Sequence, residues 1–208
     1  MTLMLDLAVP DSDSAPQRRY IDSGADLSDD GRYRWRLWRR WAEGPALMIV
    51  GLNPSTAAAD VDDATIVREV NFANGFHYSA LMKLNLYAGR ATDPRDLAGM
   101  DDPVGPDNDA YLDREAARHD LIVLAWGSNA DRVRAQSVAR RIWRNDCLVT
   151  GTSLAVLGWT RGNQPRHPLY LKSSTPLQHW QPGTRADAGG SDSRWRSLLG
   201  ESGPGGMR

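Results

Sequence analysis

The chain has 208 residues, a formal net charge of −1 and one cysteine, Cys147. This length suits one domain with a substantial hydrophobic core and is short for two. The near-zero charge gives no sign of a nucleic-acid-binding protein, although a small enzyme can gather positive charge on one face. A single cysteine excludes a disulfide bond within the chain and fits a reducing cytosol.

No stretch of the sequence has the roughly 20 consecutive apolar residues that a membrane-spanning helix needs. The first 16 residues carry an acidic Asp/Ser cluster and no basic segment before an apolar core, which does not fit a signal peptide. We therefore expect a cytoplasmic protein that does not associate with membranes, and we expect a monomer.

The composition divides the chain into three regions. We predict a flexible N-terminus over residues 1–18, a single α/β domain over 19–180 and a flexible C-terminal tail over 181–208. Segments with so few apolar residues cannot bury enough surface to fold alone. In the tail, Trp195, Leu198 and Leu199 are the only apolar anchors.

Within the domain, strand and helix patterns alternate. Tyr33, Trp35 and Leu37 alternate with arginines, which indicates a half-buried edge strand whose aromatic side chains pack inward. The same Trp/Arg stripe could instead grip nucleic acid through charge and stacking. Apolar runs predict strands over 46–51, 79–87, 121–126 and 153–157. Capping residues predict helices over 65–73 after Asp62 and Asp63, over 107–118 from Asp107, and over 130–144 after Ser128 or Asn129.

Strands that alternate with helices form βαβ units and a parallel sheet. We predict an α/β fold with three α/β/α layers, a central, mostly parallel four-stranded sheet, and an additional N-terminal strand or hairpin. In open α/β sheets, ligands bind in loops at the carboxyl ends of the strands. Polar side chains in such loops are therefore the candidates for a functional site.

The first candidate loop follows the strand predicted over 46–51. It contains Gly51, Leu52, Asn53, Pro54 and Ser55. Glycine, asparagine and proline here could simply form a turn. Alternatively, Asn53 projects its amide into a cleft to position a water molecule or a ligand. A phosphate-binding loop of the P-loop type is excluded, because no lysine follows the glycine.

Two further side chains follow apolar strands. His167, which precedes Pro168, is either a surface or core-satisfied histidine, or a hydrogen-bond donor to a developing anion. Asn85 lies inside the run 81–86, near its end, and is either satisfied by backbone groups or available to the edge of a nucleobase. An amide offers a donor and an acceptor side by side, which suits a base edge.

A metal site is a weaker alternative. Asp60, Asp62 and Asp63 could hold Mg²⁺, which favours carboxylates, but helix capping already accounts for Asp62 and Asp63. The histidines show no zinc-binding spacing. We predict neither a metal nor a cofactor.

Several segments together resemble an uncharacterised bacterial family, domain of unknown function 1643, over roughly residues 30–180. The segments that carry this resemblance are Gly51-Leu52-Asn53-Pro54-Ser55-Thr56-Ala57, Asn85-Leu86, Arg90-Ala91-Thr92-Asp93-Pro94, Asp102-Pro103-Val104-Gly105-Pro106 and Pro165-Arg166-His167-Pro168-Leu169-Tyr170. The order of Gly51–Ser55, Asn85, Trp126-Gly127-Ser128 and His167–Leu171 is also similar, more distantly, to that of the uracil-DNA glycosylase superfamily.

The glycosylase resemblance implies a uracil-DNA-glycosylase-like fold and a role for each matching residue. Asn53 would orient the attacking water, and Asn85 would hydrogen-bond a flipped base. His167 would stabilise negative charge on the departing base. Leu171 would fill the vacated base stack, since extruding a base costs a few kcal/mol and needs both a pocket and a plug.

Departures from the superfamily pattern modify these expectations. Asn53 stands where the uracil-specific branch has a carboxylate, and it cannot act as a general base. The small Ser55 replaces a bulky tyrosine and should open the pocket to larger or modified bases. Leu169 replaces a phosphate-binding serine, and Lys172 could pair with a phosphate instead.

The resulting hypothesis is a nucleobase-recognising protein that hydrolyses the N-glycosidic bond of a modified or mismatched base, with DNA or a nucleotide as partner. The alternative is a non-catalytic nucleotide- or nucleic-acid-binding module with the same cleft. Metal-assisted phosphoester hydrolysis is a third hypothesis.

Overall fold

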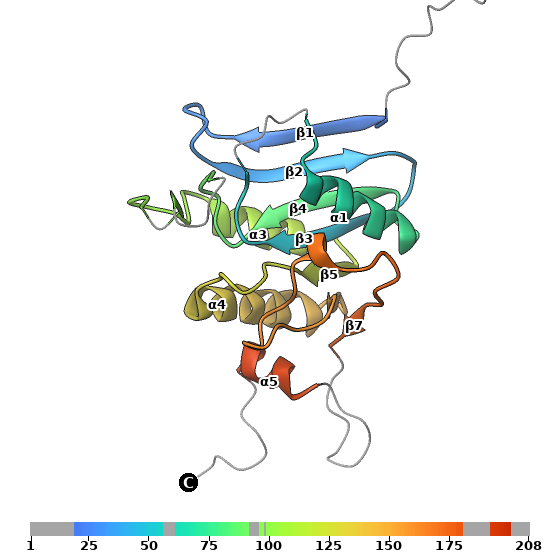
Figure 1. Ribbon diagram of the computed structural model, residues 1–208, viewed down its shortest axis with the longest axis vertical. Helices are drawn as coiled ribbons and strands as arrows, with labels where there is room; N and C mark the ends of the chain where they lie inside the picture. The colour runs from blue at the N-terminus through green and yellow to red at the C-terminus, as the bar shows by residue number, and fades with distance from the viewer. Residues whose placement is uncertain (1–18, 56–60, 92–95, 98, 181–191, 201–208) are drawn as a thin grey trace, which may run out of the picture.

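A computed structural model describes residues 19–55, 61–91, 96–97, 99–180 and 192–200 (Figure 1). The fold is mixed α/β, as predicted, and contains a seven-stranded sheet in the order β1-β2-β4-β3-β5-β6-β7. The strands are β1 (Asp22–Leu27), β2 (Arg34–Arg40), β3 (Ala46–Gly51), β4 (Ala80–Asn85), β5 (Leu121–Leu124), β6 (Ser153–Val156) and β7 (Gln178–His179). The helices are α1 (Ala64–Gly75), α3 (Asn108–Ala116), α4 (Arg132–Ile142) and α5 (Ser193–Leu199), with a π-helical turn η1 (Trp143–Cys147) and a 3-10 turn η2 (Pro168–Tyr170).

The order of the strands creates a crevice at the carboxyl ends of the parallel strands. β3 pairs in parallel with β4 on one side and β5 on the other, and β5 pairs in parallel with β6. β1, β2 and β7 join by antiparallel pairing. From β3 the chain passes through α1 to β4, then returns across β3 to β5. Where the strand order reverses, the loops after neighbouring strands diverge and leave room for a ligand.

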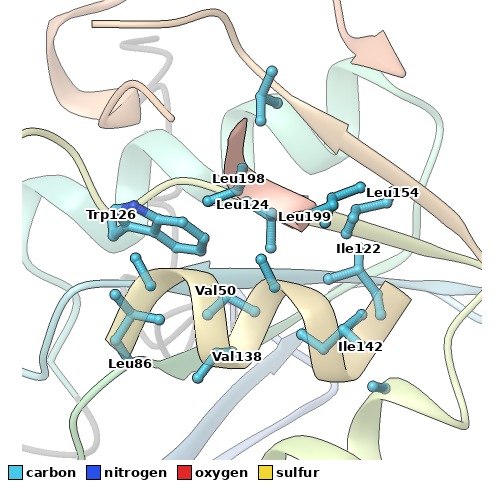
Figure 2. Close-up of a cluster of buried hydrophobic side chains, with 14 of the residues drawn as sticks. Val50, Leu86, Ile122, Leu124, Trp126, Val138, Ile142, Leu154, Leu198 and Leu199 are labelled. Atoms are coloured by element: carbon cyan, nitrogen blue, oxygen red, sulfur yellow. The ribbon is translucent and has the colours of Figure 1, made fainter. Parts of the chain in front are cut away.

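Each face of the sheet carries its own hydrophobic core. On one face, β3, β5 and β6 pack against α3, α4 and α5, and Figure 2 shows Val50, Leu124, Val138, Leu154 and Leu198 gathered in this cluster. On the other face, the alternate strand residues pack against α1 and the residue after η2. Burial on both faces explains why 47–50 and 121–125 are continuous apolar runs instead of alternating ones.

The sequence interpretation of β2 was wrong in two respects. β2 lies between β1 and β4 and is not an edge strand. Asp26 pairs with Arg36 and Leu27 with Arg34, so Trp35 is an extra, bulged residue that shifts the alternation. As a result Arg34 and Leu37 are both buried, while Trp35 is only half-buried and stacks on Tyr111 with ring centroids 5.3 Å apart.

Helix capping was predicted correctly for α1 and incorrectly for α4. The Asp63 side chain accepts a hydrogen bond from the Ile66 amide at the start of α1. The N-cap of α4 is Asp131, whose side chain accepts from the Arg134 amide, and not Ser128 or Asn129. A carboxylate at this position satisfies a helix N–H that has no partner within the helix.

The C-terminal region contains a helix that the predicted flexible tail did not include. Trp195, Leu198 and Leu199 of α5 are buried against the core beside α4, and the Trp195 ring meets Trp159 edge-on at 5.0 Å between centroids. The predicted tail is rich in Gly and Ser, and its average composition therefore does not reveal the short apolar face of α5. Residues 1–18 and the rest of the predicted tail lie outside the described residues. None of the described helices is long and apolar enough to cross a bilayer.

Candidate functional site

A pocket of about 430 Å³ lies at the carboxyl ends of the parallel strands. This volume is within the range of about 300–1,000 Å³ that is typical of small-molecule sites. Five residues predicted from the sequence line it: Leu52, Asn53, Ser55, Asn85 and His167. Trp126, Gly127 and Ser128, which follow β5, line it as well. Four segments that are distant in the sequence therefore meet at one site.

His167 enters the pocket as a neutral hydrogen-bond donor. The Leu169 amide donates to its Nδ1 at 3.3 Å, which assigns the proton to Nε2. The pKa of His167 is lowered to about 4, chiefly by burial and also by the positive charge of Lys83, while Asp63 opposes this shift. At neutral pH the imidazole is therefore uncharged. Its Nε2–H has no acceptor in the described part of the protein.

The residues after β5 hold the His167 loop in place. The Gly127 amide donates to the Pro165 carbonyl at 2.9 Å. The Trp126 indole N–H donates to Gln164 Oε1 at 2.7 Å. Gly127 has φ +80°, and a Cβ there would lie 3.3 Å from the His167 Cβ. Only glycine adopts this positive φ and this close approach to His167 without strain. Trp126 and Gly127 therefore help to position His167.

Asn85 is a buried amide whose oxygen is unsatisfied within the described part of the chain. Its side chain is 2% exposed, and its Oδ1 has no hydrogen-bond donor among the described residues. A buried polar atom without a partner is costly and uncommon in native proteins. Gly51 makes room for it, since a Cβ at Gly51 would lie 2.8 Å from Asn85 Oδ1 and would also collide with Lys83 Nζ.

Asn53 is held by the backbone of its own loop and of residue 91. Its Nδ2 donates to the carbonyls of Ala91 at 2.8 Å and Pro54 at 3.0 Å. Only its Oδ1 is left for a water molecule or a ligand, so Asn53 acts here as an acceptor. Pro54 itself is buried beside the pocket.

Ser55 and Asp63 form the opposite wall. Ser55 Oγ donates to Asp63 Oδ2 at 2.8 Å, while Asp63 Oδ1 caps α1. Burial tends to raise the pKa of Asp63, but hydrogen bonds from the Ile66 amide and Ser55 outweigh it and hold the pKa below its usual value. Asp63 is therefore ionised, and it is a weak base.

The sequence analysis missed two buried cations that line the pocket, Arg34 and Lys83. Lys83 Nζ forms a buried ion pair with Glu69 Oε1 of α1 at 2.5 Å. Burial raises the pKa of Glu69, which Lys83 opposes. Arg34 is 4% exposed and makes no side-chain hydrogen bond or ion pair with any described residue. Burial lowers the pKa of Arg34 to about 10, although Asp63 and Glu69 attract its charge. A lysine inside the apolar run 81–86 was the available signal for Lys83.

Two predicted roles do not fit the positions of their residues. Leu171, proposed as a wedge, is 6% exposed and packs into the core on the α1 face. η2 turns Leu171 inward and leaves Tyr170, which is 81% exposed, at the mouth of the pocket. The ring centroids of Tyr170 and His167 are 6.3 Å apart. Lys172 is exposed and Pro168 is buried, and neither residue lines the pocket.

The carboxylates proposed as metal ligands point to different partners. Asp62 accepts hydrogen bonds from Arg39 Nε at 2.7 Å and from the Tyr20 hydroxyl, whereas Asp63 caps α1. In the part of the chain that the structure describes, no group of three or more His, Cys, Asp or Glu side chains could hold a metal ion. Asp60, Thr56, Ala57 and residues 92–94 lie outside that part.

The fold and the pocket define an α/β protein with a polar site at the carboxyl ends of its central strands. The family described as "Protein of unknown function (DUF1643)" matches residues 34–169, and the chain belongs to this family. The matched region runs from Arg34 to just after His167 and so contains the pocket-lining residues other than Tyr170. No curated protein and no solved structure shows a significant similarity to the chain.

Proposed function

We propose that this pocket recognises a nucleobase and that the protein hydrolyses the N-glycosidic bond of a modified or mismatched base. The observation that carries the proposal is the convergence of Asn53, Asn85 and His167 in one pocket. Their order along the chain resembles that of the uracil-DNA glycosylase superfamily. The parallel pairing of β4, β3, β5 and β6, with a core on each face, supports a three-layer arrangement of that type.

The base would be held and activated by neutral polar groups. Asn85 Oδ1 accepts a hydrogen bond from an N–H on the base edge, which gives this buried atom the partner that it lacks. His167 Nε2–H donates to a base oxygen. Tyr170 offers an exposed ring for stacking at the mouth.

The bond between the sugar C1′ and the base nitrogen breaks with its electron pair moving to the base. His167 stabilises the negative charge that develops there, because the Nε2–H of its neutral imidazole donates a hydrogen bond to the base oxygen. A water molecule held by Asn53 Oδ1 forms the new bond to C1′ and releases its proton to Asp63 or to solvent. Since Asp63 is a weak base, the rate depends chiefly on stabilising the departing base.

Release of free base by the full chain tests the proposal. The substrates are DNA containing uracil, mismatched thymine or a modified pyrimidine, and the corresponding nucleotides, with the products separated by chromatography. We expect H167Q to reduce the rate by about 10²-fold or more, as the loss of one such donor does in other enzymes. H179Q is the matched control, because His179 is exposed on β7 and does not line the pocket. If no substrate releases base and none binds, the proposed function is wrong.

A second candidate is a non-catalytic binding module, and Asn53 favours it. The Asn53 amide nitrogen is tied to two carbonyls, and the nearby carboxylate, Asp63, serves as a helix cap. Neither group is a good base. This candidate predicts binding that requires Asn85 and His167, with no base released by the same samples.

A further inference from the structure

We propose that the ligand of this pocket is a free nucleoside monophosphate, whose phosphate is held by Arg34, and not a base within a DNA strand. This inference rests on the proposed recognition of a nucleobase and names the class of molecule that carries the base.

Arg34 is a buried cation that is unpaired within the described part of the chain. It lines the pocket, is 4% exposed, and forms no ion pair or side-chain hydrogen bond with any residue in the described ranges. Its position is fixed by the bulge in β2 and by its amide, which donates to the Ala88 carbonyl at 2.9 Å. Burying an unpaired charge opposes folding, so such a residue is expected to serve a ligand.

The other buried charges beside Arg34 already have partners. Lys83 is paired with Glu69, and Asp63 accepts hydrogen bonds from Ser55 and the Ile66 amide. None of these carboxylates lies within ion-pair distance of Arg34. A guanidinium offers five N–H donors in a planar fork that matches two oxygens of a phosphate. The unpartnered donors of Arg34 therefore specify an anionic, oxygen-rich group.

The burial of Arg34 decides between a nucleotide and a strand. When a base is flipped out of DNA, the phosphodiesters stay on the strand outside the pocket. They would meet exposed cations such as Lys172, or Arg166, which lines the pocket but is exposed to solvent, unlike Arg34. Arg34 can reach only an anion that enters the pocket together with the base. A pocket of about 430 Å³ belongs to the size class that encloses whole small molecules.

Calorimetric titration of the full chain tests the inference. The probes are the 5′-monophosphates of adenosine, guanosine, cytidine, uridine and thymidine, the matching nucleosides, and a single-stranded oligonucleotide. For the base that binds, we expect the monophosphate to bind at least tenfold more tightly than the nucleoside. R34Q should remove this preference while leaving nucleoside affinity unchanged, and R34K should retain part of it. R161Q is the matched control, since Arg161 is exposed and does not line the pocket.

The possible results separate this inference from the proposed function. If nucleoside and monophosphate bind equally, and both depend on Asn85 and His167, base recognition stands and the phosphate site is wrong. If K172Q or R166Q, and not R34Q, removes the preference, an exposed cation holds the phosphate and the inference is overturned. Tighter binding of the oligonucleotide that is insensitive to R34Q overturns it as well. If no probe binds, both proposals fail.

Folding of the variants is checked by circular dichroism and thermal unfolding. A second measurement does not depend on the base. Inorganic phosphate at millimolar concentration should raise the unfolding temperature of the wild type and of R161Q. It should leave that of R34Q unchanged. An equal response of all three proteins contradicts an anion site at Arg34.

Discussion

Replacing Arg34 with methionine should stabilise the unliganded protein. Methionine keeps an unbranched apolar stem of similar reach and removes the charge. Most substitutions of buried residues destabilise a protein. A gain in stability would therefore be a specific result.

The magnitude follows from the pKa of Arg34. Burial lowers it from the usual arginine value to about 10, and at roughly 1.4 kcal/mol per pKa unit this depression corresponds to about 3 kcal/mol. The guanidinium is charged in the folded and the unfolded chain at pH 7, and the folded state disfavours that charge. The cost is therefore present at all pH values below about 10 and disappears as the pH rises from there to the usual pKa of arginine. We expect R34M to gain about 1–3 kcal/mol.

Urea unfolding at pH 7, followed by fluorescence and extrapolated linearly, measures the change. R39M is the control, because Arg39 is equally buried but is paired with Asp62 at 2.7 Å. Breaking that pair should cost about 3–5 kcal/mol. If R34M loses more than about 1 kcal/mol, Arg34 supports the fold and the reasoning about its unpaired charge is refuted.

Three further predictions concern the neighbouring residues. Because the pKa of His167 is about 4 in the folded protein and 6.5 in the unfolded chain, the unfolded chain binds an extra proton between these values. Wild-type stability should therefore fall as the pH drops from 6.5 to 4, and H167Q should fall less; parallel urea titrations at pH 4.5 and 7 that shift equally would contradict this. L171A should cost about 2–5 kcal/mol because Leu171 is in the core, whereas Y170A should leave stability unchanged and weaken ligand binding. The reverse pattern in unfolding and calorimetry would restore Leu171 as a surface wedge. G127A should destabilise the protein by about 1 kcal/mol or more, because Gly127 has φ +80°, and should weaken binding through His167; wild-type affinity in a folded G127A would show that this contact does not position the imidazole.

The central elements could be predicted because their patterns are local. The continuous apolar run of β3 gave its bounds, 46–51, and Asp63 was correctly placed at the start of α1. The meeting of Asn53, Asn85 and His167 followed from a general rule: neighbouring parallel strands have their carboxyl ends on the same side of the sheet, so the loops after them lie together.

The missed features depend on contacts that are not local. Arg34 was assigned to an exposed face because a strand alternates with period two, and the bulge at Trp35 reverses that phase. Leu171 was assigned by its place after His167, but η2 turns the chain so that Tyr170 takes the exposed position. Neither the bulge nor the turn leaves a clear mark in the sequence.

The two outer strands of the sheet bear on pairing between sheet edges of different molecules. A long apolar strand at a sheet edge is a template for pairing with another molecule. Here the edge strands are β1, which contains Asp22 and Asp26, and β7, which has only two residues. The β-prone apolar segments 46–50 and 121–124 lie in the interior, paired on both sides. They become available for aggregation only when the sheet itself opens, so resistance to aggregation should follow the global unfolding free energy.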